Sequence, residues 1–178
     1  KLIVADIDAQ LMPLEPSLPF DIDLTRGKVQ WPFSGDADYK AQINSLQANG
    51  VLDSYSLDLL GAVQGQQIPD VELAVSGLGS LEQVDLTSTN IKGLGGEIDG
   101  SVLVNWATPI NWAADLTLDQ IQPGTYWSDA EGNISGHLVT TGQLPEQGGW
   151  EVVLSQLNID GIFRDYPLNI NGTLDAKD

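Results

Sequence analysis

The sequence predicts an all-β protein built from one long antiparallel sheet with an apolar face and a polar face. Apolar residues recur at every second position in segment after segment. Tyr55, Leu57 and Leu59, for example, alternate with hydroxyl and acidic residues. Turn signals rich in glycine and proline, such as Gly93 to Gly96, separate these segments. Few of the segments have apolar residues at the spacing of a helix. A two-residue period is typical of strands that bury one face, and short turns favour antiparallel pairing.

The alternation places candidate strands along the whole chain. We expect them at residues 2–8, 20–25, 28–31, 37–46, 53–64, 70–78, 83–89, 97–106, 111–119, 133–142, 149–157, 158–164 and 167–175. The pattern is most regular in 97–106, where Val102 and Val104 interleave with polar residues, and it returns in 111–119. No long linker divides the chain, so we expect a single curled sheet segment over 1–178.

One segment fits two local structures. Tyr39, Ile43 and Leu46 have helical spacing behind Asp38, a residue type that can cap a helix N-terminus. The same residues extend through the candidate strand 37–46. A short helix and a strand therefore both fit the sequence there.

A short repeat places an isoleucine two residues before a glycine. It recurs at Gly100, Gly136, Gly161 and Gly172, and each of these glycines falls on the apolar phase. Asp-Gly and Asn-Gly pairs can form hairpin turns, but the alternation continues in phase through each glycine. This continuity favours strands that are bent or thinned at the glycine.

Composition excludes several classes of function. The chain has 25 acidic and 7 basic residues, a net charge of -18, which opposes binding to nucleic acid and to anionic membrane surfaces. It has no cysteine, and His137 is its single histidine, so thiolate chemistry is absent and acid–base options are few. There is no initiator methionine and no apolar run long enough to span a bilayer, so we interpret the chain as a piece of a longer protein.

Three motifs offer alternatives to a purely structural role. Abundant carboxylates and Trp127, next to Tyr126, would suit a glycosidase or a sugar-binding loop. The segment from Asp129 to Asn133 has several possible oxygen ligands around a glycine, as calcium-binding loops do. It is too short for a helix-loop-helix calcium site. Most acidic residues fall on the polar phase, where they solvate the sheet. We expect no catalytic residue, no cofactor, no metal and no enzymatic activity.

The apolar face must be covered in some way. A sheet of this length can close on itself, fold into a β-sandwich, or curl into a trough around another molecule. The alternation alone does not choose among these architectures, and the β-sandwich is the simplest alternative to a trough.

Four stretches taken together resemble the TamB family, the periplasmic subunits of the translocation and assembly module. They are Gly96 to Trp106, Pro109 to Leu116, Gly132 to Gly136, and Gly161 to Leu168. The resemblance is to the C-terminal region of these large envelope proteins. It implies a sheet curled into an open trough with an apolar interior, as in the AsmA-like, bridge-like lipid-transfer proteins. It also favours a strand over a helix at 39–46.

The resemblance further implies a location and partners. Full-length relatives are anchored in the inner membrane and cross the periplasm to TamA, an outer-membrane partner of the Omp85 class. They support outer-membrane protein and autotransporter assembly, and they move phospholipids between the two membranes. The membrane anchor and the partner-docking segment have no counterpart in these 178 residues.

We expect the shared apolar phase to form the lining of a hydrophobic groove. The candidate lining residues are Ile22, Leu24, Tyr55, Leu57, Leu59, Val63, Val71, Leu73, Val75, Ile98, Val102, Val104, Trp106, Trp112, Ala114, Leu116, Leu118, Ile134, Leu138, Val152, Leu154, Ile159, Phe163, Leu168, Ile170 and Leu174. The groove would shield phospholipid acyl chains or, alternatively, unfolded strands of outer-membrane proteins. A sugar-binding or adhesive β-domain is the alternative from another class.

Overall fold

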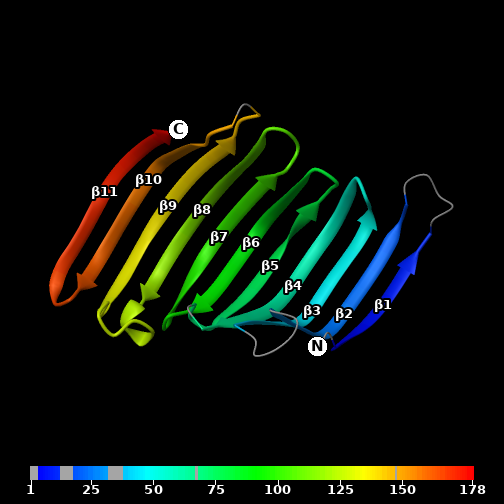
Figure 1. Cartoon of the computed structure of the whole chain (residues 1–178), viewed down its shortest axis with the longest axis horizontal. Helices are drawn as coiled ribbons and strands as arrows, with labels where there is room; N and C mark the ends of the chain where they lie inside the picture. Colours follow the sequence, from blue (N-terminus) through cyan, green and yellow to red (C-terminus); the bar gives the residue numbers. More distant parts are fainter. Residues whose placement is uncertain (1–3, 13–17, 32–37, 67, 147) are drawn as a thin grey trace.

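A computed structural model describes residues 4–12, 18–31, 38–66, 68–146 and 148–178. In these ranges the chain forms one 11-stranded sheet in which each strand pairs antiparallel with its sequence neighbours (Figure 1). The strands are β1 (Val4–Leu11), β2 (Phe20–Trp31), β3 (Tyr39–Val51), β4 (Ser54–Gly65), β5 (Val71–Gly79), β6 (Gln83–Gly93), β7 (Gly96–Asn105), β8 (Ile110–Ile121), β9 (Gly132–Leu144), β10 (Glu151–Phe163) and β11 (Tyr166–Lys177). The prediction of an all-β fold is confirmed.

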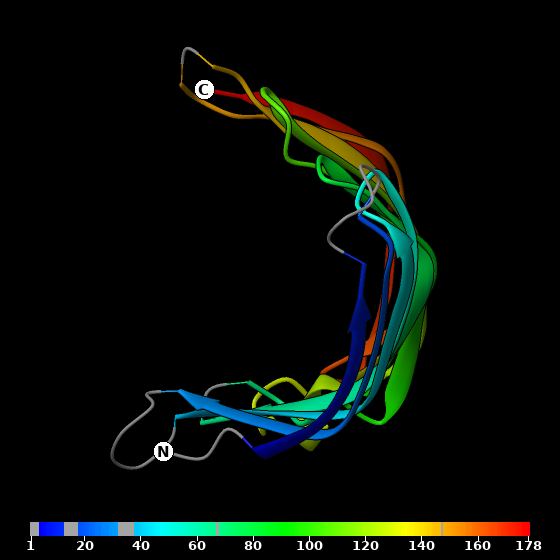
Figure 2. The same cartoon turned by 90° about the vertical axis from the view of Figure 1, so that its right-hand side faces the viewer.

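The sheet is a single curved layer. Figure 2 shows that both ends of the strands bend toward the same side, so that the cross-section is C-shaped and one side is open. The two outermost strands, β1 and β11, do not pair with each other. Within the described ranges the only other element is the short 3-10 helix η1 (Pro123–Thr125) between β8 and β9. The fold is therefore the open trough, and the β-sandwich alternative is wrong.

Two pairs of expected strands are single strands in the structure. Segments 20–25 and 28–31 both lie in β2, while 149–157 and 158–164 together cover all of β10 and extend slightly beyond its ends. In its pairing with β1, the register of β2 shifts between Thr25, opposite Asp6, and Lys28, opposite Val4, and Arg26 in this interval has a positive φ of 56°. The register of β10 with β9 shifts between Leu154 and Gln156. Each break in the alternation is thus a β-bulge inside a continuous strand.

The segment that also fitted a helix is strand β3. A register shift between Ile43 and Ser45 in its pairing with β4 changes the phase of the alternation. Ile43 and Leu46 consequently face the same side of the sheet although they are three residues apart. The helical spacing in the sequence is therefore the signature of a bulge. Residues 2, 3 and 37 of the expected strands lie outside the described residues.

The repeated glycines lie inside strands, as expected, in β7, β9, β10 and β11. A Cβ atom on Gly100, Gly136 or Gly161 would overlap the carbonyl oxygen of a neighbouring strand. These glycines therefore permit a close approach of the backbones where the sheet curves.

In the described part of the chain, no helix is both long and apolar enough to cross a membrane.

Candidate functional site on the concave face

One face of the sheet carries continuous rows of aliphatic side chains. Residues directly opposite each other in antiparallel strands share a face, so the strand registers define rows that cross the sheet. The central row consists of Leu24, Leu46, Leu59, Val75, Thr89, Gly100, Leu116, Leu138, Leu157 and Gly172. This row runs along the axis of the trough from β2 to β11.

Two further rows flank the central one. The first consists of Ile22, Ala48, Leu57 and Gly77 and, beyond a bulge, Leu86, Val102, Ala114, Thr140, Leu154 and Leu174. The second consists of Gly27, Ile43, Gly61, Leu73, Ile91, Ile98, Leu118, Gly136, Ile159 and Ile170. We call these three rows the floor. They contain no acidic, basic or histidine side chain.

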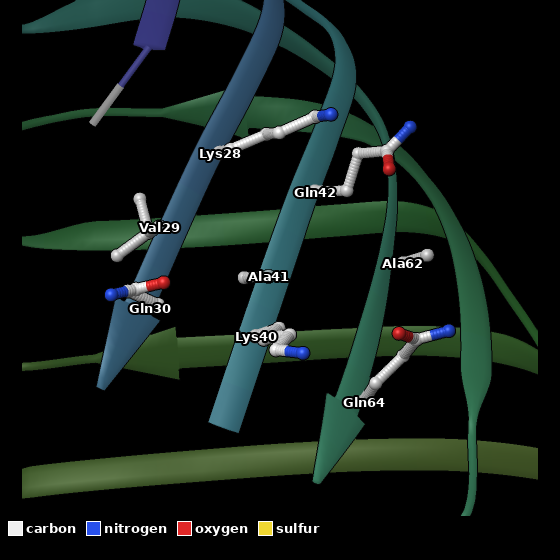
Figure 3. Close-up of a pocket in the computed structure, with 8 residues that line it drawn as sticks. All are labelled: Lys28, Val29, Gln30, Lys40, Ala41, Gln42, Ala62 and Gln64. Carbon is white, nitrogen blue, oxygen red and sulfur yellow. The ribbon is translucent and has the colours of Figure 1, made fainter. Parts of the chain in front are cut away.

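The floor lies on the inside of the curve. Leu60 and Leu78 on the opposite face are 51% and 56% exposed, whereas Leu57 and Leu59 of the floor are half-buried. Because no second layer of the described residues covers either face, the lower exposure arises from crowding by neighbouring side chains on the concave side. In Figure 3, likewise, the long side chains of Lys28, Gln42 and Gln64 lie on the outer side of the bend. Val29 points to the inner side.

The structure places nearly all candidate lining residues on this concave face. Trp106 is the exception in position, because it follows the end of β7 and its Nε1 donates to the Leu81 carbonyl oxygen at 2.6 Å. Ile170 and Leu174 lie on the edge strand β11 and are 42% and 55% exposed. Each of the other candidates points to the same face of the sheet as the floor residues of its own strand.

Sequence reasoning missed several residues of the same face. The missed residues are Ile43, Leu46, Val84, Leu86, Ile91, Ile121 and Leu157, and they concentrate on the bulged strands β3, β6, β8 and β10. Beyond a bulge, the residues that face inward change from even to odd numbers or the reverse. A strict count of every second residue therefore assigns them to the wrong face. Their signal in the sequence was a step of three between apolar residues, as in Leu118 and Ile121.

Polar groups on the concave face are few. Thr89 is 5% exposed, and among the described residues its hydroxyl is the one buried side-chain polar atom without a hydrogen-bond partner. Thr140, also on the floor, donates its hydroxyl hydrogen to the Val153 carbonyl oxygen at 3.1 Å. The floor therefore offers an apolar surface, and its three rows contain no acidic, basic or histidine side chain that could act as a general acid or base.

The convex face is mostly polar and holds the only histidine, His137. The Gln156 amide nitrogen donates to His137 Nδ1 at 2.9 Å, and His137 Nε2 lies 2.6 Å from Asp115 Oδ1, to which it donates. The shallow hollow in Figure 3 also lies on this face, between Lys28, Lys40 and neighbouring amide side chains. These side chains solvate the outer surface of the trough.

The loop motifs have structural partners. The Tyr126 and Trp127 rings pack edge to face at 4.9 Å, and the Tyr126 hydroxyl donates to the Gln66 carbonyl oxygen at 3.0 Å. The Asp129 carbonyl oxygen accepts a hydrogen bond from Arg164 Nε at 2.6 Å. Among the described residues, no cluster of histidine, aspartate and glutamate could hold a metal ion.

A single-layer sheet with an aliphatic concave face, left uncovered by the described part of its own chain, defines an apolar β-trough protein. The family comparison gives a more specific identity. The chain belongs to the TamB family, because the family model described as TamB, N-terminal domain, matches residues 1–178. Members of this family are periplasm-spanning, non-enzymatic subunits of the translocation and assembly module, which also contains TamA.

The family match corrects one expectation. The sequence motifs suggested the C-terminal region of a TamB protein, whereas the matching model describes the N-terminal domain. The motifs are short alternations with an inward glycine, and a repetitive β-trough uses that pattern along its length, so they identify the family better than the position within it. No solved structure matches the chain.

Proposed function

We propose that this chain is one segment of a longer periplasmic β-trough whose concave face shields phospholipid acyl chains on their way between the inner and outer membranes. In the same role it supports assembly of outer-membrane proteins, autotransporters included, together with the Omp85-class partner TamA. The full-length protein would be anchored in the inner membrane. The strands β1 and β11, which have no strand partner on their outer sides among the described residues, would continue the sheet into neighbouring segments.

One observation carries the proposal: the aliphatic floor extends from β2 to β11, and no second layer of the described residues lies over it. Moving a lipid with about 30 methylenes from a membrane into water would cost about 25 kcal/mol, at about 0.8 kcal/mol per methylene. Contact with the floor removes much of that cost, because the floor replaces water around the acyl chains. A segment from Tyr55 to Val63 spans about 26 Å, at about 3.3 Å per residue, enough to wrap around acyl chains.

A paired substitution on β9 tests the proposal. Leu138 lies on the floor between Leu116 and Leu157, while Thr141 is exposed on the convex face between Ala113 and Val153. Leu138→Asp places a carboxylate among acyl chains and should reduce phospholipid binding at least tenfold. Thr141→Asp adds the same charge to the same strand outside the trough and should leave binding within about twofold of the unchanged protein.

The measurement is copurification and titration of a fluorescent phospholipid, with circular dichroism and thermal unfolding to show that both variants fold. Equal binding by both folded variants would remove the concave face from the lipid path. Loss of folding only in Leu138→Asp would instead indicate a floor that serves as a filled core.

Unfolded strands of outer-membrane proteins are the second candidate guest. The observation in their favour is the free outer side of β11, where an extended peptide could add as a further strand. An unfolded outer-membrane protein should then bind equally well to the unchanged protein and to Leu138→Asp, because strand addition uses backbone groups at the sheet edge. A sugar-binding role would instead require oligosaccharide affinity that Trp127→Ala abolishes.

A further inference from the structure

Aromatic and aliphatic residues are segregated on the concave face. On the described strands, the aromatic residues of this face lie at strand ends, where the trough meets water. Along one rim they are Phe20, Tyr55 and Trp112, at the first, second and third positions of β2, β4 and β8. Along the opposite rim lie Tyr39, Phe163 and Tyr166, each at the end of a strand. The floor between the rims contains only aliphatic residues, glycines and two threonines.

The rim aromatics rest flat on glycines of adjacent strands. Tyr55 lies opposite both Gly50 and Gly79, and a Cβ atom on Gly79 would overlap the tyrosine ring. Trp112 lies opposite Gly142, where an added Cβ would overlap its six-membered ring. The rings therefore line the edge of the trough without narrowing it. Phe20 extends the same rim, with its ring centroid 5.6 Å from that of Tyr55.

This segregation differs from that of a packed protein interior. Aromatic side chains bury large areas and dominate the energetics of packed cores, so a filled core would use them in its interior as well as at its edge. Tyrosine and tryptophan gather at the boundary when an apolar phase meets water, because each has an apolar ring and one hydrogen-bond donor. The concave face therefore has the pattern of a hydrocarbon layer bordered by two aqueous interfaces.

We propose that the rim formed by Phe20, Tyr55 and Trp112 is a positioning site for the glycerol-ester region of a two-chain lipid whose acyl chains lie on the floor. The Tyr55 hydroxyl and the Trp112 indole N–H donate to ester oxygens, and the rings cover the first methylenes. The headgroup then emerges through the open side of the trough. This inference rests on the proposed function, to which it adds a defined orientation of the guest.

Two photoreactive phosphatidylethanolamines test the orientation on the unchanged chain. One has a diazirine on the headgroup amine, and the other has it at the ends of the acyl chains. After irradiation, the cross-linked residues are mapped by peptide mass spectrometry. The headgroup probe should label the strand ends near Phe20, Tyr55 and Trp112, and the chain-end probe should label floor residues such as Leu57 and Leu116.

The outcomes separate the two proposals. If both probes label the floor and the rim alike, lipids bind without the proposed orientation, and the rim site is wrong while the proposed function stands. If neither probe labels the concave face, the proposed function fails as well.

The double variant Tyr55→Leu with Trp112→Leu tests the rim chemically. It keeps apolar side chains but removes both donors, so phosphatidylethanolamine binding should weaken about five- to tenfold, the effect of losing one or two net hydrogen bonds. Binding of hexadecane, which has no ester, should change less than about twofold. Unchanged phosphatidylethanolamine binding by the folded variant would overturn the rim site, as would an equal loss for both ligands.

Discussion

Single glycines set how closely the strands can approach, and Gly100 is the clearest case. It lies on the floor opposite Leu116, and a Cβ atom there would overlap the Asp115 carbonyl oxygen. Gly172 occupies the same place in the repeat and in the same row, but it lies on the edge strand β11 with nothing within 4 Å of an added Cβ. The two positions share a motif but differ in their neighbours and in backbone conformation, because Gly100 has a φ of +158° and Gly172 has no positive φ.

We expect Gly100→Ala to destabilise the protein by about 1–3 kcal/mol, because the backbone of β8 must move away from the new methyl group. Gly172→Ala, the matched control, should change the stability by less than about 0.5 kcal/mol. Urea unfolding followed by circular dichroism measures both. Equal effects at the two positions would show that β7 and β8 do not approach as closely as described.

Bulges set which face each strand presents. In β8, Leu118 pairs with Gly136 and Ile121 with Ile134, while Gln120 between them has a positive φ of 52°. In a regular strand that alternates strictly from Leu118, Ile121 would point outward. The bulge thus keeps the end of the strand in phase with the floor while the sheet curves.

The bulges also explain how far sequence reasoning could reach. The period of two predicted the all-β class, the continuous strands β4, β5, β7 and β9, and most of the floor. It split β2 and β10 and missed Ile121 and Leu157, because a bulge is fixed by backbone conformation that arbitrary residues such as Arg26 and Gln120 adopt. The curvature was implied only by the inward glycines and the family resemblance, since alternation is the same in flat and curled sheets.

Replacing Gln120 with glycine tests the bulge in β8. A left-handed backbone conformation costs a residue with a side chain about 1–2 kcal/mol, and glycine avoids this cost. Glycine also makes the unfolded chain more flexible, which offsets part of the gain in stability. We expect Gln120→Gly to stabilise the protein by about 0.5–1 kcal/mol in urea unfolding. Thr117→Gly, in extended backbone on the same strand, should destabilise it by about 1 kcal/mol. Destabilisation by both substitutions would refute the left-handed bulge.

The whole molecule combines an apolar concave side with a largely polar, acidic outside. The net charge of -18 keeps the outer surface hydrated and opposes association between copies through their convex faces. The open side of the C-shaped section leaves the floor accessible along the full width of the sheet (Figure 2). Under the proposed function, a guest would move along the axis of the trough by following these rows of similar aliphatic side chains from strand to strand.

The most direct test compares two adjacent residues of β8 that point to opposite faces. A photoreactive benzoylphenylalanine is placed either at Leu116, on the floor, or at Thr117, exposed on the convex side. The protein is irradiated in the periplasm, and phospholipid bound covalently is identified by mass spectrometry. We predict phospholipid adducts through their acyl chains at Leu116 and none above background at Thr117. Equal adducts at both positions, or only protein adducts at Leu116, would contradict a lipid-filled trough.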